Sequence, residues 1–218
     1  MSEAALYRRR KLLLVAARLI VRTLARVDYR HLDRLPSGPA ILAPNHLGHA
    51  DPLLLAAALA VPPDVVALSD LAHERVAPLV RYYRPFLVHR DLYDRTVLRQ
   101  ARGALRRGNQ LVIFPEARIS VTGALEPARD GVGYLALLCD VPLIPIAITG
   151  TERAWQTLRS GRRPALTLTV GDPLYPRDAP TAPRREQRTW LTTTLMQRIA
   201  ALLPAAYRGV YSDWREGE

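Results

Sequence analysis

The 218-residue sequence has one cysteine, one lysine and few aromatic residues, and these scarcities exclude several classes of protein. Because Cys139 stands alone, the chain can form neither an internal disulfide nor a cysteine-based metal cluster, which fits a reducing compartment such as the cytoplasm. Aromatic residues make up 6% of the chain, and neither an RNA-binding aromatic signature nor a recognition-helix pattern is present. We therefore expect no nucleic-acid partner.

Motifs for nucleotide and metal cofactors are also missing. The sequence contains neither a Gly-x-Gly-x-x-Gly fingerprint nor a Walker loop, and its five histidines are not spaced as a set of metal ligands. We expect neither a metal nor a bound organic cofactor.

Positive charge is abundant. The formal net charge is +11, and almost all of the positive charge is arginine, since Lys11 is the only lysine. Arginine usage can reflect the base composition of a genome as well as phosphate recognition. An anionic surface or substrate is the expected partner. The length and the 49% hydrophobic content suit one α/β domain with a sizeable core.

Residues 8–27 are expected to form a helix with two different faces. At about 100° per residue, five basic residues fall within an arc of about 80°. These are Arg8, Lys11, Arg18, Arg22 and Arg26, and the opposite side carries Leu13, Leu14, Ala17, Ile20, Val21 and Leu24. A membrane-spanning helix would bury two arginines near its middle at about 2.5–3.5 kcal/mol each, and no signal-peptide cleavage pattern follows.

Two interpretations of this helix remain. Residues 1–30 can form a basic amphipathic helix in the interface of an anionic membrane, which would place the protein peripherally on the cytoplasmic face of the cell membrane. Alternatively, the apolar side packs on the domain core. The arc of arginines favours the membrane.

The rest of the chain, residues 31–218, alternates between short apolar runs and helical periodicity. Strands are expected at residues 41–44, 65–68, 86–89, 110–114, 142–148 and 165–170, and helices at 53–60, 71–83, 93–107, 132–139 and 184–203. This alternation predicts a single α/β domain with a largely parallel mixed sheet flanked by helices.

Polar residues follow three of the expected strands. His46 and Asp51 bracket one strand-to-helix junction, Arg90 follows a second strand, and Glu116 and Arg118 follow a third. Sites in open α/β sheets form at the carboxyl ends of strands, so these residues can converge on one crevice. Asp51 would accept a hydrogen bond from one ring nitrogen of His46 and leave the other free to take a proton; alternatively, Asp51 only caps the helix.

Four sequence blocks, in order, resemble those of the glycerolipid acyltransferase family, which includes 1-acylglycerol-3-phosphate and lysophospholipid acyltransferases. The resemblance runs from about Pro39 to Gly171. Residues 45–51, Asn-His-Leu-Gly-His-Ala-Asp, match the His-x4-Asp motif; the other blocks are Arg90, Phe-Pro-Glu at 114–116 and Val-Pro-Leu-Ile-Pro at 141–145.

The resemblance implies a reaction and roles for particular residues. His46 would act as general base on the hydroxyl of a lysophospholipid acceptor, with Asp51 holding its ring, and the acyl donor would be the thioester of acyl-CoA or acyl carrier protein. Neither a metal nor a covalent acyl-enzyme is required. The expected substrate-binding residues are Arg90 and Arg118, which would receive a phosphate, together with Glu116, Asn45 and Ser120.

The third block departs from the family pattern. Ala117 stands where the family has glycine, so an ordinary turn without positive φ is expected there. Residues 118–123 look more like those of acyltransferases that reacylate lysophosphatidylethanolamine, so the acceptor can be 1-acylglycerol 3-phosphate, lysophosphatidylethanolamine or glycerol 3-phosphate. His49 lies off the two key positions of the motif and is read as a neighbour. A membrane-binding protein without catalytic activity on the same fold is the second functional hypothesis.

Overall fold

The computed structural model describes residues 2–70, 77–88 and 95–212. The α-helices are α1 (Glu3–Leu24), α2 (Asp51–Ala58), α3 (Ala77–Tyr83), α4 (Arg95–Arg106), α5 (Gly131–Cys139), α6 (Ala154–Arg159) and α7 (Arg184–Leu202). The strands are β1 (Arg26–Arg30), β2 (Ala40–Pro44), β3 (Asp64–Leu68), β4 (Phe86–Val88), β5 (Gln110–Val112), β6 (Leu143–Thr149) and β7 (Ala165–Val170).

The seven strands form one sheet in the order β1-β7-β6-β2-β5-β3-β4. All neighbouring pairs are parallel except β6 and β7, which are antiparallel. In the centre, Leu42 of β2 pairs with Val112 of β5 on one side and with Ile144 of β6 on the other. The carboxyl ends of β2 and β5 therefore lie side by side, and the residues that follow these strands can meet.

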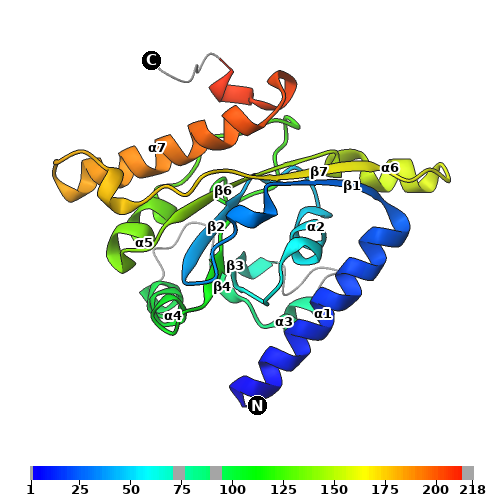
Figure 1. Ribbon diagram of the computed structural model, residues 1–218, viewed down its shortest axis with the longest axis horizontal. Coiled ribbons are helices and arrows are strands. Elements are labelled where there is room, and N and C mark those ends of the chain that lie inside the picture. Colours follow the sequence, from blue (N-terminus) through cyan, green and yellow to red (C-terminus); the bar gives the residue numbers. More distant parts are fainter. Residues whose placement is uncertain (1, 71–76, 89–94, 213–218) are drawn as a thin grey trace.

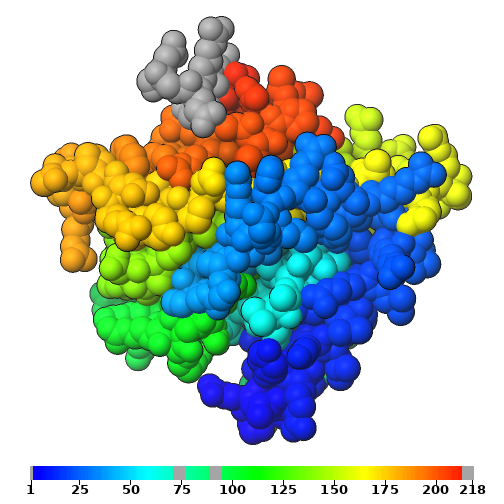
Figure 2. Space-filling view, in the orientation of Figure 1, coloured from blue at the N-terminus to red at the C-terminus, as the bar shows by residue number. Residues whose placement is uncertain are grey.

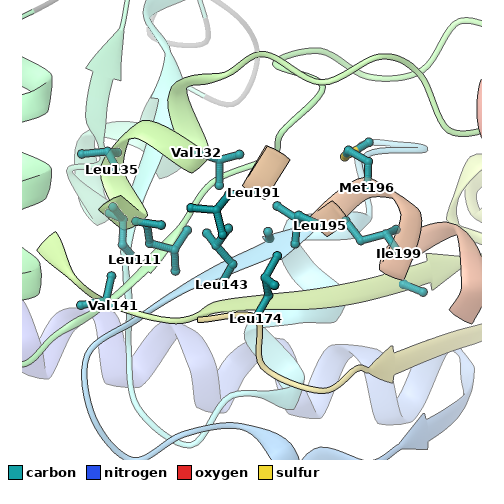
Figure 3. Close-up of a cluster of buried hydrophobic side chains, with 14 of the residues drawn as sticks. Leu111, Val132, Leu135, Val141, Leu143, Leu174, Leu191, Leu195, Met196 and Ile199 are labelled. Atoms are coloured by element: carbon teal, nitrogen blue, oxygen red, sulfur yellow. The ribbon is translucent and has the colours of Figure 1, made fainter. Parts of the chain in front are cut away.

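Helices cover both faces of the sheet, as Figure 1 shows. On one face α4, α5 and α7 enclose an apolar cluster that includes Leu135, Leu191 and Leu195, seen in Figure 3. On the other face α1 and α2 enclose a second cluster around Leu14, Leu54 and Ile144. Strand β2 contributes residues to both clusters because it is buried along its whole length. The predicted single α/β domain with a largely parallel mixed sheet is confirmed.

The structure differs from the expectation near residue 30. The N-terminal helix ends at Leu24, and the next residues form β1, which pairs in parallel with β7 at the edge of the sheet. The boundary between the helix and the domain therefore moves from residue 30 to about residue 25. Strand β1 was not expected from the sequence, because the helix expected over residues 8–27 includes its first two residues.

Helix α1 packs on the domain through the apolar side of the helix. Leu14, Ala17 and Val21 are buried in the cluster shared with α2. Arg10 is buried as well, and its Nη1 donates to Asp64 Oδ1 at 2.7 Å. Arg18, predicted to face a membrane, donates instead to the backbone carbonyl oxygens at the end of α2. The apolar side of α1 thus packs on the core of the domain.

Candidate active site

The centre of the candidate site is the junction between β2 and α2. Asp51 is the first residue of α2, and its side chain makes no hydrogen bond to the first turn of that helix. Its Oδ2 instead accepts from the backbone N–H groups of Leu47 and Gly48, at 2.7 and 2.8 Å, and lies 2.7 Å from His46 Nδ1. Asp51 is fully buried. The carboxylate therefore fixes both the loop and the imidazole, a role different from the helix cap considered above.

The His46 ring is held from two directions. Because an ionised carboxylate only accepts hydrogen bonds, a neutral imidazole paired with it has its proton on Nδ1 and its free lone pair on Nε2. The ring also stacks on Phe114, with centroids 4.1 Å apart and planes 30° apart. The His46 side chain is 16% exposed. This arrangement leaves one basic nitrogen for a proton from a substrate hydroxyl.

Glu116 connects β5 to the histidine through the backbone. Its Oε2 accepts from the N–H of His46 at 2.6 Å, and its Oε1 accepts from the N–H of Glu126 at 2.8 Å. Burial raises the pKa of Glu116 to about 7, against the lowering effect of these two N–H donors. Both oxygens of Glu116 are thus occupied, which makes it a residue that organises the site.

Glu126 organises the loop that follows, and its role was not predicted from the sequence. Its Oε2 accepts from Arg118 Nε and Nη2 at 2.6 and 2.5 Å, while Oε1 accepts from the N–H of Val121 at 2.8 Å. Burial alone would raise the pKa of Glu126, but these donors outweigh it and hold the pKa below its usual range. In the same loop, the N–H of Ser120 donates to the carbonyl of His46 at 2.8 Å. The loop therefore holds both backbone groups of His46.

Ala117 contradicts the expectation of an ordinary turn. Its φ is +54°, in the left-handed region, where an L side chain costs roughly 1–2 kcal/mol. The hydrogen bonds of Glu116 and Glu126 on either side hold the loop in a path that requires this conformation. The conformation expected for the family's glycine is therefore kept without the glycine.

Asn45 and Arg90 were also expected to bind substrate, and the structure describes only Asn45. Asn45 is fully buried, and its side chain accepts from the N–H of Ile148 at 2.7 Å and donates to the carbonyl of the same residue at 3.0 Å. It ties β2 to β6, which is a structural role, and substrate binding by Asn45 stays a prediction. Arg90 lies outside the described residues.

A cavity of about 340 Å³ lies beside the loop. It is lined by Glu116, Ala117, Arg118, Glu126, Pro127 and Arg129. Ser120 does not line it, because the Ser120 hydroxyl is turned into the loop and donates to the carbonyl of Ala124 at 2.6 Å. Two guanidinium groups at one cavity are suited to an anionic group of a substrate.

Comparison with known proteins places this site in a family. Residues 26–149, more than half of the chain, match the family described as Acyltransferase. The chain belongs to this family.

The similar proteins carry related names. The chain is 38% identical over 65 residues to a 1-acyl-sn-glycerol-3-phosphate acyltransferase of Cocos nucifera. The matched segment covers 30% of this chain but only 21% of that enzyme. The chain is 23% identical over 191 residues to the enzyme of that name from Bacillus subtilis, with 86% and 93% of the two chains covered. The crystal structure of the 1-acyl-sn-glycerophosphate (LPA) acyltransferase PlsC from Thermotoga maritima has a similar fold, with a TM-score of 0.66, 20% identity and 88% and 80% coverage.

Proposed function

We propose that the protein transfers a fatty acyl group from an acyl thioester to the free hydroxyl of a lysophospholipid such as 1-acylglycerol 3-phosphate. The observation that carries this proposal is the 2.7 Å contact between His46 Nδ1 and the fully buried Asp51. The names of the relatives from Cocos nucifera and Bacillus subtilis support the acceptor class. The donor in this proposal is acyl-CoA or an acyl carrier protein.

The proposed mechanism uses His46 as a general base. Nε2 takes the proton of the acceptor hydroxyl as its oxygen attacks the thioester carbonyl, and the negative charge of Asp51 stabilises the imidazolium that forms. The tetrahedral intermediate then collapses, the C–S bond breaks, and the thiolate takes the proton back from His46. The products are the ester and the free thiol. The N–H groups of residues 46–48 are bonded to Glu116 and Asp51, so the oxyanion must be stabilised by other donors.

The cavity next to the loop is the proposed place of the acceptor phosphate. Arg118 is aligned by Glu126, and its side chain remains 51% exposed. Arg129 lines the same cavity from the other end of the loop. We expect the two guanidinium groups to bind the phosphate of the lysolipid, whose hydroxyl would then be presented to His46.

A direct assay tests this proposal. Purified protein is incubated with palmitoyl-CoA or palmitoyl acyl carrier protein and with each of three acceptors: 1-acylglycerol 3-phosphate, lysophosphatidylethanolamine and glycerol 3-phosphate. We expect the highest kcat/KM with 1-acylglycerol 3-phosphate, and product formation is measured by mass spectrometry. A preference for lysophosphatidylethanolamine, whose phosphate is a diester, would reject the phosphate-monoester assignment while keeping the reaction. A preference for glycerol 3-phosphate would keep the phosphate assignment and reject the lysolipid acceptor. An absence of transfer to all three acceptors with both donors would reject the function.

We further propose that the outer side of α1 contacts the membrane in which the acceptor resides. Opposite the packed side, Leu12, Val15 and Leu19 are 64%, 54% and 67% exposed and fall within an arc of about 60°. Lys11 and Arg22 lie next to one edge of this arc, and both are exposed. Exposed leucines next to basic residues suit the interface of an anionic bilayer. Among the described residues no helix is long and apolar enough to span a membrane.

The membrane proposal predicts an effect for Leu19→Ser. We expect binding to anionic phospholipid vesicles to weaken about fivefold or more, because a leucine side chain inserted in the interface contributes about 1 kcal/mol or more. Vesicle sedimentation measures the binding. Val210→Ser is the matched control, since Val210 is 64% exposed and lies near the other end of the chain. Equal binding of the two variants would contradict this role of α1.

A further inference from the structure

Helix α4 carries a line of four arginines, Arg95, Arg99, Arg102 and Arg106. At about 100° per residue they fall within an arc of about 60°, and the eleven residue steps from first to last span roughly 16 Å. The buried residues of α4, including Val97, Ala101 and Leu105, lie on the opposite side and face the core. The structure therefore places about one arginine per helical turn on the side of α4 opposite the core, with three of them exposed and Arg102 half-buried. We call these four residues the α4 arginine stripe.

The α4 arginine stripe borders a shallow groove against α5. A depression of about 180 Å³ is lined by Arg95, Leu98, Arg99, Arg102, Tyr134 and Leu138. Neither α4 nor α5 contains an acidic residue. Within the ranges that the structure describes, none of the four arginines forms an ion pair, and Arg102 Nε is buried without a hydrogen-bond partner. The groove thus presents positive charge that is not neutralised by the described part of the chain.

One end of the α4 arginine stripe lies toward the candidate active site. Arg106 precedes Gln110, the first residue of β5, by four residues, and α4 packs along β5. Helix α4 therefore runs back along the strand, with Arg106 near the amino end of β5 and Arg95 toward its carboxyl end. Glu116 and His46 lie at that carboxyl end. In Figure 1, α4 and α5 are neighbours on the side of the sheet away from α2, and Figure 2 shows green atoms of this region at the surface.

We propose that the α4 arginine stripe docks an acidic carrier protein that delivers the acyl thioester to His46. The proposal rests on the acyl-transfer function proposed above and names the partner of that site. A row of cations about 16 Å long fits carboxylates repeated along a helix of a partner protein.

A bilayer fits this surface less well than a protein. Insertion into a membrane interface needs exposed apolar side chains beside the basic ones. The large apolar residues of α4 are not of that kind, because Val97 and Leu105 are buried and Leu98 is half-buried. The exposed leucines of α1 lie on the helix that packs against the other face of the sheet. A carrier protein on α4 and a membrane at α1 would therefore use different surfaces.

The test compares two triple variants of the full-length chain. The first, Arg95→Gln, Arg99→Gln and Arg106→Gln, removes three exposed arginines of the stripe and leaves half-buried Arg102 in place. The control, Arg162→Gln, Arg184→Gln and Arg185→Gln, removes three exposed arginines elsewhere, so both variants change the net charge by the same amount. Glutamine forms helices about as well as arginine, and we expect both variants to fold.

Direct binding is measured first, by fluorescence anisotropy with a labelled holo acyl carrier protein that carries no acyl chain. We expect the Kd of the stripe variant to rise about tenfold and that of the control less than twofold, with the difference shrinking as salt is added. In the transfer assay the KM for palmitoyl acyl carrier protein should rise about tenfold at unchanged kcat. The KM for palmitoyl-CoA should change less than twofold.

Several results would overturn the docking proposal. Equal losses in the two triple variants would assign the effect to net charge, an equal rise of the KM for palmitoyl-CoA would assign the stripe to phosphate, and a selective loss of vesicle binding would assign it to a membrane. Wild-type protein that binds no carrier protein would also reject it, even if it transfers palmitate from palmitoyl-CoA. Carrier binding without transfer from either donor would reject the acyl-transfer function and leave docking standing.

Discussion

The variant His46→Ala is expected to reduce kcat by at least about a thousandfold in the acyl-transfer assay. The change removes the general base, and general-base catalysis contributes about 10²–10⁴ in rate. It also removes the group that Asp51 and Phe114 hold in place. Because the backbone N–H of His46 still donates to Glu116 in an alanine variant, the loop should keep its path and the KM for the acceptor should change little.

The control for this prediction is His49→Ala. His49 lies three residues along the same motif and is exposed, so its loss should leave kcat within about twofold of wild type. Circular dichroism and thermal unfolding check that both variants fold. Transfer by His46→Ala at the rate of the wild type would show that another group accepts the proton, and the assignment of His46 would be wrong.

Most of the fold could be predicted because its strands and helices have recognisable patterns of apolar residues in the local sequence. Six of the seven strands are short apolar runs between helices, and residues of these strands are buried on both sides of the central sheet. Strand β1 was missed although Val27 and Tyr29 alternate with charged residues as in a half-buried strand, because the helix expected over residues 8–27 includes its first two residues. Its position at the edge of the sheet could not be predicted, because it depends on pairing with β7, about 140 residues away.

The face of α1 that packs on the domain could have been identified from one residue. Arg10 falls at a helical angle between those of Ala17 and Val21, in the middle of the apolar side. A charged residue in that position predicts a buried partner, and the structure provides Asp64. Periodicity alone separates basic from apolar residues, but it does not reveal that Leu12 and Leu19 are exposed on the side opposite the core.

Part of the site could be predicted, because the spacing of its residues in the sequence matches the chemical roles expected of them. The contact of His46 with Asp51 and the approach of Glu116 follow from the positions of β2 and β5 and agree with the sequence blocks. The role of Glu126 was not visible, because nothing in the loop sequence shows that this carboxylate turns inward to Arg118. The positive φ of Ala117 was hidden for the same reason, since tertiary hydrogen bonds override the local preference.

Asp51→Asn is the second variant for which we expect a very large effect. Its kcat should fall about 10²–10⁴-fold, because the neutral amide oxygen that takes the place of Oδ2 accepts the Nδ1–H bond more weakly than a carboxylate and leaves His46 a poorer base. The amide also lacks the negative charge that stabilises the imidazolium. Steady-state kinetics with 1-acylglycerol 3-phosphate measures this loss, and the KM should change far less than kcat.

The stability of Asp51→Asn separates this role from a structural one. A single oxygen of Asp51 accepts from the N–H groups of Leu47 and Gly48, and the amide oxygen of asparagine can keep both bonds. We therefore expect urea unfolding to report a loss of about 1–2 kcal/mol, against almost none for the exposed control Asp33→Asn. Asp51→Ala leaves both N–H groups unpaired and should lose more stability at a similar kcat. If the kcat of the Asp51 variants falls only in proportion to the unfolded fraction, Asp51 supports the loop and does not tune His46.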